Sequence, residues 1–176
     1  ISAGLPEPKT IYVHGFITLD GQKMSKTIGN VIDPFQVVEK YGVDVVRYFL
    51  LREIPSGDDG DFSQKNLEAR YNSDLANGLG NLVQRVVTLI DTKLDKELIY
   101  KKEYLDQGET YSQVIDDKEF DQAIKNFRLH DALSDLWKKI GLINAYVNDK
   151  KPWGLVDQSP EDFLKVMTTL VAMIHH

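Results

Sequence analysis

The sequence contains no cysteine, so its 176 residues provide neither a disulfide bond nor a thiolate metal site. It has no apolar run of membrane-spanning length, and its N-terminus lacks the charged-then-apolar pattern of a secretory signal. These absences favour a cytoplasmic protein with no membrane contact. An initiator methionine is missing too, and the last residues continue an amphipathic helical pattern. We therefore expect an excised piece of a larger protein.

A surplus of positive charge is also missing, because the formal net charge is −6 at pH 7. Proteins that bind nucleic acids usually carry a basic surplus, since neutralising phosphates supplies much of their affinity. Any RNA-binding role must therefore depend on a local basic face and on direct contacts to bases.

The N-terminal part of the chain predicts a strand followed by a tight turn. Residues 11–19 are rich in β-branched and aromatic side chains, and Asp20-Gly21 follows them as a turn dipeptide. We expect one strand over this stretch, bent at Gly15, with the residues after the turn delivered from its end.

Two short helices are predicted next. Asp33, followed by a proline, is typical of a helix N-cap with a first-turn proline, and Asp44 is a candidate cap for the second helix. Residues 56–61 are acidic and glycine-rich, which indicates a solvated linker. We place the domain boundary there, with one domain over 1–62 and another over 63–176.

The second domain is helical in its pattern throughout. Four amphipathic segments with apolar residues three and four apart follow one another without intervening strands. Such a series predicts an antiparallel helical bundle, so the fold class is mainly α with a small α/β part. The expected core includes Leu75, Leu79, Leu82, Leu133, Leu136, Ile140, Val166 and Leu170.

The most informative segment is Lys23-Met24-Ser25-Lys26-Thr27, directly after the predicted turn. The two lysines are three residues apart, and the loop also contains the small hydroxyl residues Ser25 and Thr27. Together they make a cationic loop suited to binding polyphosphate. An ammonium on a flexible stem can follow a phosphate as it moves. An isolated pair of lysines is more often a solvated basic loop, so the interpretation depends on the flanking residues.

The flanking residues resemble the methionyl-tRNA synthetases, a family of class I aminoacyl-tRNA synthetases. The loop is similar to the second signature of class I enzymes, with Thr27 where serine is usual. The likeness weakens only between residues 91 and 117. The other segments that carry it are Val13-His14-Gly15-Phe16, Gly29-Asn30-Val31-Ile32-Asp33-Pro34, Val46-Arg47-Tyr48-Phe49-Leu50-Leu51-Arg52, residues 74–85 and Lys151-Pro152-Trp153.

This resemblance implies that the loop takes part in the activation of methionine with ATP, accompanied by Mg²⁺. Lys26 matches the lysine that contacts ATP and is the expected main catalytic residue, with Lys23 as a weaker candidate. Ser25 and Thr27 keep hydroxyls available to the phosphates. His14 is expected to be structural or adjacent to ATP, because this chemistry requires no proton transfer.

The resemblance also implies a division of the chain. Residues 1–62 correspond to the end of a Rossmann-type catalytic domain, and residues 63–176 to a helical anticodon-binding domain truncated at its C-terminal end. The first signature of the family, a His-x-Gly-His type of motif, does not occur, and neither does the cysteine-bearing zinc insertion. We expect the chain alone to be inactive and to hold no metal.

Three residues are expected to read the CAU anticodon of tRNA(Met), according to the same resemblance. Asn81 and Arg85 lie four apart and therefore on one helical face, and an amide with a guanidinium suits the Watson–Crick edge of cytosine. Trp153 follows a proline at an expected corner, where its ring would serve as a stacking platform. The candidate phosphate contacts are Lys138, Lys139, Lys150 and Lys151.

Three alternatives remain open from the sequence. The chain would be a non-catalytic tRNA-binding module if no catalytic half preceded it, although such a module has no need of the lysine loop. Valyl, isoleucyl and leucyl enzymes share much of this loop, but they lack the Asn81 and Arg85 helix and the Pro-Trp element at this spacing. A structural helix bundle with coincidental motifs would bind no tRNA at all.

Overall fold

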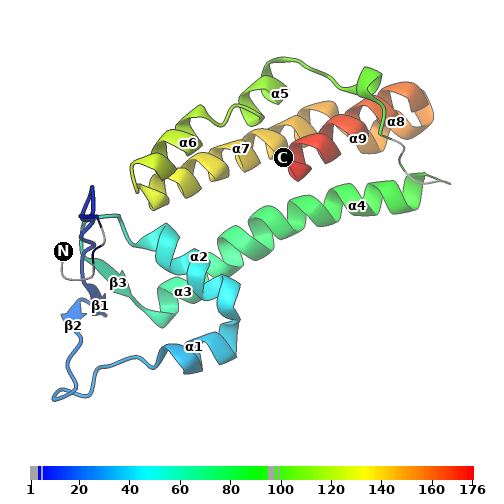
Figure 1. Cartoon of the computed structure of the whole chain (residues 1–176). Coiled ribbons are helices and arrows are strands. Elements are labelled where there is room, and N and C mark those ends of the chain that lie inside the picture. Colours follow the sequence, from blue (N-terminus) through cyan, green and yellow to red (C-terminus); the bar gives the residue numbers. More distant parts are fainter. Residues whose placement is uncertain (1–3, 5, 95–97, 99) are drawn as a thin grey trace. The chain divides into compact units, whose positions relative to one another are not determined.

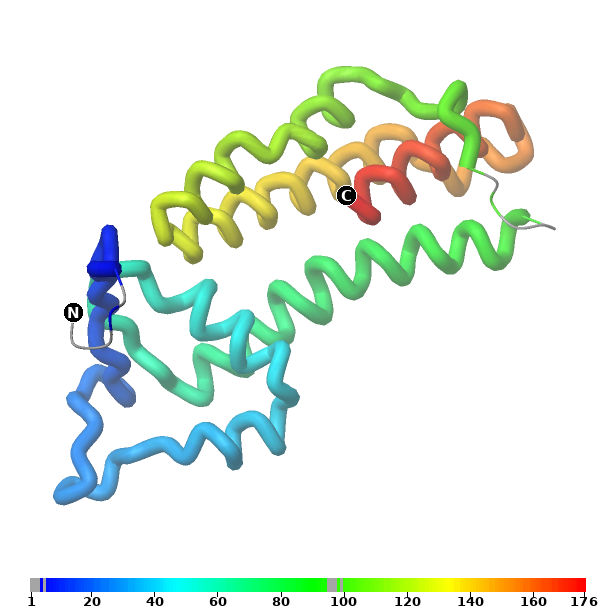
Figure 2. The backbone as a smooth tube through the Cα atoms, in the orientation of Figure 1, coloured from blue at the N-terminus to red at the C-terminus, as the bar shows by residue number. Residues whose placement is uncertain are grey.

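The computed structural model describes residues 4, 6–94, 98 and 100–176, and it forms two compact units, Ile1–Ser63 and Gln64–His176. Figure 1 labels the helices and strands, and Figure 2 follows the same path as a backbone tube. The first unit combines a small sheet with two helices, and the second is helical in its described residues. The expectation of a mainly α chain with a small α/β part is confirmed.

The sheet of the first unit has three short strands in the order β2-β1-β3, namely β1 (Ile17–Leu19), β2 (Gln22–Lys23) and β3 (Gly60–Phe62). β1 pairs antiparallel with β2 and parallel with β3. The Asp20-Gly21 hairpin is confirmed, because both residues have positive φ angles of 49° and 76°, as such tight turns require.

The expected strand over residues 11–19 is wrong in its first part, since only Ile17–Leu19 is a strand. The close approach of another segment explains the difference. A Cβ on Gly15 would lie 2.0 Å from the carbonyl oxygen of Asp58, and the Phe16 amide donates to the Asp59 carboxylate at 2.7 Å. These contacts hold the backbone around Gly15 and Phe16 against Asp58 and Asp59, so regular pairing with β3 begins only at Ile17, which pairs with Gly60.

Two helices complete the first unit, α1 (Pro34–Tyr41) and α2 (Val43–Glu53). Asp33 caps α1 as expected, because its carboxylate accepts from the Phe35 amide at 2.9 Å. α2 begins at Val43 rather than after Asp44, which lies in its first turn. On its buried face, the ring of Phe49 meets that of Phe62 edge-on, with centroids 5.4 Å apart.

The second unit begins with a continuous helical stretch that changes its geometry twice. α3 (Gln64–Arg70) leads into a π-helical segment, η1 (Tyr71–Gly80), which continues as α4 (Asn81–Lys93). The remaining elements are η2 (Lys102–Tyr104), α5 (Glu109–Val114), α6 (Lys118–Lys125), α7 (Leu129–Lys150), α8 (Pro152–Gln158) and α9 (Pro160–His175). Figure 1 shows α4 and α7 running in one direction and α5, α6 and α9 in the other, so the predicted antiparallel bundle is confirmed.

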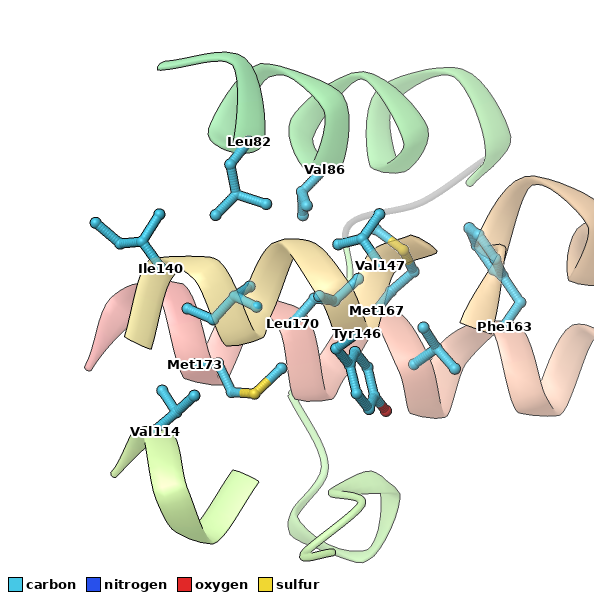
Figure 3. Close-up of a cluster of buried hydrophobic side chains, with 12 residues drawn as sticks. Leu82, Val86, Val114, Ile140, Tyr146, Val147, Phe163, Met167, Leu170 and Met173 are labelled. Atoms are coloured by element: carbon cyan, nitrogen blue, oxygen red, sulfur yellow. The ribbon is translucent and has the colours of Figure 1, made fainter. Parts of the chain in front are cut away.

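The core of this bundle lies between α4, α7 and α9, with α5 closing one side (Figure 3). Four of the expected core residues are buried: Leu82, Ile140, Val166 and Leu170. Leu75 and Leu133 are partly buried, while Leu79 and Leu136 keep 37% and 40% of their surface exposed.

The assignment of Leu79 and Leu136 to the core is therefore wrong. A π-helix turns more slowly than an α-helix, so a stripe drawn at α-helical spacing across η1 does not stay on one face. Both leucines instead line an open cavity of about 410 Å³ beside α6 and the end of α9.

A polar network attaches the segment between α4 and α6 to the bundle. The Asp106 amide donates to the Thr169 hydroxyl at 2.9 Å, and the Tyr146 hydroxyl donates to the Asp106 carboxylate at 3.3 Å. The Lys150 ammonium lies 3.7 Å from the same carboxylate. Burial and the nearby Asp106 carboxylate raise the pKa of Tyr146 to about 12.

Candidate functional site

The lysine loop starts at the end of the β1–β2 hairpin and is closed by its own backbone. The amides of Ile28 and Gly29 both donate to the Ser25 carbonyl, at 3.2 and 3.0 Å. Gly29 has a φ of 78°, which favours glycine at this corner. The carboxamide of Asn30 spans the turn, accepting from the Ser25 amide at 2.8 Å and donating to the Lys23 carbonyl at 3.1 Å.

The two lysines of this loop have different surroundings. The Lys23 ammonium lies over the Phe16 ring, 5.4 Å from its centroid. Lys26 and Thr27 are exposed, and Ser25 is half-buried. Within the described part of the chain, Lys26 has no carboxylate within ion-pair distance, so its charge is available to an anionic ligand.

His14 lies before this sheet and is exposed. Its Nδ1 lies 2.8 Å from the carbonyl oxygen of the adjacent Gly15. Among the described contacts, its ring meets no residue of the lysine loop, so the structure does not bring His14 and the lysines together directly.

Sequence reasoning missed the acidic residues that hold the hairpin. One oxygen of the Asp61 carboxylate accepts from the Thr18 hydroxyl and from the Gly21 amide, both at 2.7 Å. Asp59 accepts from the Phe16 amide, as described above. The interpretation of residues 56–61 as a solvated linker is therefore wrong, because this stretch includes the start of β3 and anchors the turn that precedes the loop.

The second candidate site gathers side chains from α4, α7 and α8. Arg85 is half-buried, and its Nη2 donates to the Asn148 side-chain oxygen at 3.1 Å. Its guanidinium carbon also lies 5.9 Å from the centroid of the Trp153 ring, a cation–π geometry. Asn81 is exposed at the start of α4, one helical turn before Arg85. The structure thus brings Arg85 and Trp153 together and adds Asn148, which sequence reasoning did not single out.

Trp153 lies in the first turn of α8 and keeps 48% of its surface exposed. Lys151 before it adopts a left-handed conformation with φ 45°, and Pro152 starts the helix. This sharp change of direction between α7 and α8 presents the indole at the surface, where a planar base can stack on it.

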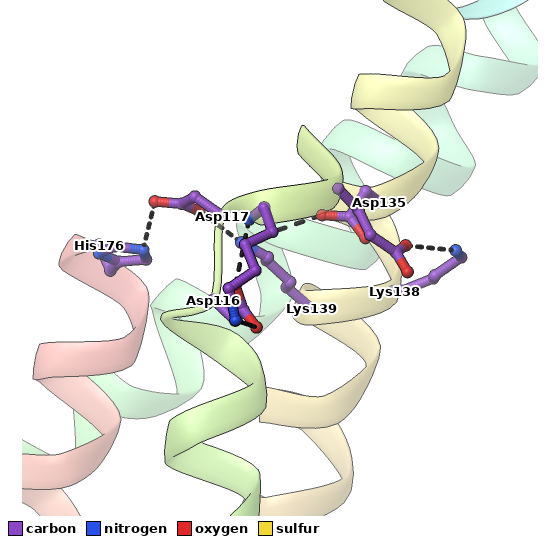
Figure 4. Close-up of polar contacts among 8 residues, drawn as sticks. Asp116, Asp117, Asp135, Lys138, Lys139 and His176 are labelled. Carbon is purple, nitrogen blue, oxygen red and sulfur yellow. Dashed lines mark hydrogen bonds and ion pairs between the residues drawn. The ribbon is translucent and has the colours of Figure 1, made fainter. Parts of the chain in front are cut away.

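The four lysines expected to contact phosphates differ in what they touch. Lys139 is buried and its ammonium bonds to Asp117, so its assignment as a phosphate contact is wrong (Figure 4). Lys138 pairs with Glu119 at 3.6 Å on the surface, and Lys150 pairs with Asp106. Lys151 is exposed beside Trp153.

The buried lysine belongs to a structural charge cluster. Its bond to Asp117 holds the pKa of that carboxyl below its usual value, and His176 Nε2 lies 3.0 Å from the other oxygen of Asp117. Asp135 lies 3.9 Å from the same ammonium, and burial raises the pKa of its carboxyl. These groups hold α6, α7 and the end of α9 together rather than forming a reactive site.

The described residues include no group of three histidine, aspartate or glutamate side chains placed to hold a metal ion. None of the helices in that part of the chain combines the length and the apolar character needed to cross a membrane.

Comparison with known proteins gives a consistent assignment. Residues 1–87 match the family described as tRNA synthetases class I (M). The methionine–tRNA ligase of Thermotoga maritima is 40% identical over 164 residues, which cover 87% of this chain and 25% of that protein. The ligase of Bacillus subtilis is 39% identical over 165 residues, covering 92% of this chain and 25% of that protein.

Solved structures agree with these relatives. The Mycobacterium tuberculosis methionyl-tRNA synthetase in complex with methionyl-adenylate superposes with a TM-score of 0.80 at 36% identity, covering 98% of this chain and 34% of that one. The chain belongs to the methionyl-tRNA synthetase family. The apo form of the same Mycobacterium tuberculosis synthetase gives a TM-score of 0.76 at 33% identity over the same share of each chain. This member of the methionyl-tRNA synthetase family spans about a quarter of the length of the curated relatives it matches.

Proposed function

We propose that this chain forms part of a methionine–tRNA ligase and supplies two of its working parts. The lysine loop serves the activation of methionine with ATP, and the cluster of Asn81, Arg85 and Trp153 reads the CAU anticodon of tRNA(Met). The observation that carries the proposal is that Arg85 and Trp153, 68 residues apart by number, meet at the bundle surface in a chain of this family. The substrates fit a cytoplasmic enzyme.

The loop is suited to stabilising charge on ATP as it reacts. In the proposed step a methionine carboxylate oxygen attacks the α-phosphorus, the bond to the bridging oxygen breaks, and pyrophosphate leaves with its negative charge. Such a transition state needs positioned cations more than a covalent nucleophile. Lys26, exposed at the tip of the loop, is the group we assign to that charge.

The neighbours of Lys26 take supporting roles in this proposal. Lys23 helps to shape the loop, because its ammonium lies over the Phe16 ring. The hydroxyls of Ser25 and Thr27 are available to phosphate oxygens or to Mg²⁺-bound ATP. His14 is assigned to the surroundings of ATP, with no proton transfer required of it.

The anticodon cluster suits a cytosine and a stacked base. The Arg85 guanidinium provides donors for O2 and N3 of cytosine, and the Asn81 amide oxygen can accept from N4. The exposed part of the Trp153 ring provides a stacking face, worth about 1–3 kcal/mol per base. Lys151, exposed next to Trp153, is placed to contact a phosphate despite the net charge of −6.

A non-catalytic tRNA-binding module is the second candidate, and the exposed bundle cluster alone would serve it equally well. The ordered lysine loop favours the ligase, because a binding module has no use for a pyrophosphate-stabilising segment. A valyl, isoleucyl or leucyl enzyme is less favoured, since the relatives reported above are all methionine enzymes.

Methionine-dependent ATP–pyrophosphate exchange tests the catalytic part of the proposal in a full-length protein that contains this chain. Lys26→Ala should lower kcat by about a hundredfold or more with little change in KM for methionine, as expected for a contact made mainly in the transition state. Lys9→Ala, which removes another exposed lysine of the same unit, is the matched control and should exchange normally. Normal exchange by the Lys26 variant would remove the role assigned to it.

A further inference from the structure

Asn30 is the one residue outside the lysine loop whose side chain bonds to the loop backbone on both sides in the described structure. Its carboxamide oxygen accepts from the Ser25 amide at 2.8 Å, and its carboxamide nitrogen donates to the Lys23 carbonyl at 3.1 Å. The residue itself is half-buried. The side chain therefore bridges the end of β2 and the turn that carries Lys26.

These two bonds complement the backbone bonds within the turn. The Ser25 carbonyl accepts from the amides of Ile28 and Gly29, while the Ser25 amide is bonded to Asn30. Both polar groups of the Ser25 backbone are thus hydrogen-bonded to the residues that directly follow the loop. Lys26, the next residue, follows directly from this fixed peptide, and its side chain is left exposed.

We propose that Asn30 is a positioning residue that holds the lysine loop in the conformation from which Lys26 meets the polyphosphate. The inference rests on the proposed role of Lys26. A loop that is already ordered before ATP binds avoids the entropy cost of becoming ordered during the reaction. The position of the charged group also matters, because a displacement of about 1 Å can lower the rate on the order of a hundredfold. Among the described contacts, both hydrogen bonds of the Asn30 side chain go to backbone groups of the loop, so its contribution is made through Lys26.

The chemistry of the two contacts requires a carboxamide. One end must accept from an N–H and the other must donate to a carbonyl, and asparagine offers both on a short side chain. Aspartate keeps the acceptor for the Ser25 amide and loses the donor for the Lys23 carbonyl. Alanine loses both, so the two variants separate the two bonds.

Amide hydrogen exchange of the chain itself tests the geometry. The Ser25 amide should be protected in the wild type and in Asn30→Asp, and it should exchange about tenfold faster or more in Asn30→Ala, because that variant has no acceptor. Gln36→Ala, which removes an exposed carboxamide from α1, is the matched control and should leave the loop unchanged. Equal protection of Ser25 in the wild type and in Asn30→Ala would overturn the inference.

Pyrophosphate exchange in a full-length protein containing this chain tests the positioning role. Asn30→Ala should lower kcat by about tenfold to a hundredfold while KM for methionine stays within about twofold, because the loop contributes mainly in the transition state. Asn30→Asp should fall between the wild type and Asn30→Ala. A normal kcat for Asn30→Ala would contradict the positioning role.

Lys26→Ala separates failure of this inference from failure of the proposed function. If Lys26→Ala is impaired and Asn30→Ala is normal, only the positioning role is wrong. If Lys26→Ala itself exchanges normally, the assignment of the loop is wrong. The double variant should be no slower than Lys26→Ala alone, because Asn30 acts through that lysine. Additive losses would show that Asn30 acts by another route.

Discussion

Two neighbours hold the Arg85 guanidinium at the surface of the bundle. Asn148 on α7 accepts a hydrogen bond from it, and the Trp153 ring lies 5.9 Å from its central carbon. An arginine held in this way loses little side-chain freedom when it binds a base, which favours affinity and selectivity. Within the described part of the chain, the guanidinium donates no other side-chain hydrogen bond, so its remaining N–H donors are available to a ligand.

The contact with Asn148 leads to the first prediction about recognition. Asn148→Ala should weaken binding of a CAU stem-loop by about 1 kcal/mol, less than Arg85→Ala, because it removes the orientation of Arg85 and leaves its charge in place. Asn126→Ala at the end of α6, remote in sequence from the cluster and exposed, is the control. Fluorescence titration with the stem-loop gives both values, and an unchanged affinity for Asn148→Ala would refute this role.

Single residues also show which parts of the site were predictable. Asp33 could be assigned as a helix cap because its partner, the Phe35 amide, is two residues away. Asp61 could not, because it bonds to Thr18 and to Gly21, which lie 43 and 40 residues away in the sequence. The buried pair of Lys139 and Asp117 is equally invisible in the sequence, since the two residues are 22 apart and lysine is normally a surface residue.

At the scale of elements, the π-helical segment η1 is the feature that sequence patterns missed. Its apolar residues continue the spacing of an α-helix, so nothing in the sequence marks the change of geometry over Tyr71–Gly80. The change decides which leucines are buried, because Leu67 and Leu82 on either side are fully buried while Leu79 within it is exposed. It also precedes Asn81 directly, so the face on which Asn81 and Arg85 lie depends on it.

Gly80→Ala tests this segment, because α-helical and π-helical geometry predict opposite changes in the free energy of unfolding. In an ordinary α-helix, Gly→Ala stabilises by about 1 kcal/mol. Here a Cβ on Gly80 would lie 2.9 Å from the Leu75 carbonyl oxygen, a backbone atom that cannot move away easily. Gly80→Ala should therefore lower the free energy of unfolding, by about 1–3 kcal/mol.

Gly141 on α7 is the matched control for this substitution, because a Cβ there meets nothing within 4 Å. Gly141→Ala should stabilise the bundle by about 0.5–1 kcal/mol. Urea unfolding followed by circular dichroism measures both variants. Stabilisation by both would mean that residues 71–80 are α-helical.

The helices of the bundle were otherwise well predicted, for physical reasons. α7 and α9 carry regular apolar faces and begin or end at strong signals such as Pro152 and Ser159-Pro160. α8 was missed, since seven residues after a proline give no clear periodicity. Leu136 keeps 40% of its surface exposed, so truncating it should cost less than truncating Leu170, which is fully buried and whose replacement by alanine should cost about 2–5 kcal/mol.

For the whole molecule, Tyr146 connects stability to pH through the contact between α7 and the segment before α5. The pKa of Tyr146 is raised from 10.0 to about 12 in the folded state, by burial first and by the Asp106 carboxylate second. The folded protein therefore holds this proton more tightly than the unfolded chain. This contribution is fully present below pH 10 and is lost as pH rises towards about 12.

The expected result is a fall in the free energy of unfolding of about 2–3 kcal/mol from this group as the pH passes through that window. Tyr146→Phe should lose less free energy of unfolding than the wild type as the pH rises above 10. Near neutral pH the variant should be no more stable than the wild type, because its hydrogen bond to Asp106 is gone. Tyr100→Phe, which alters a tyrosine with 59% of its surface exposed, is the control. Identical alkaline profiles for the wild type and Tyr146→Phe would show that this group does not contribute.

The molecule as a whole carries a net charge of −6, and this number separates two accounts of RNA binding. If phosphate contacts dominated, such a chain would bind RNA weakly, with little preference among sequences and a steep dependence on salt. If Asn81, Arg85 and Trp153 contact bases, affinity should depend on the anticodon and only moderately on salt. The arrangement of Arg85 and Trp153 favours the second account.

A titration of the chain with two stem-loops tests this central claim most directly, one bearing CAU and the other a changed first anticodon base. The account predicts that the CAU stem-loop binds more tightly by about 1–3 kcal/mol, and that Arg85→Ala removes most of this difference while Lys151→Ala weakens both stem-loops alike. Equal affinity of the wild type for the two stem-loops, unchanged by Arg85→Ala, would contradict it.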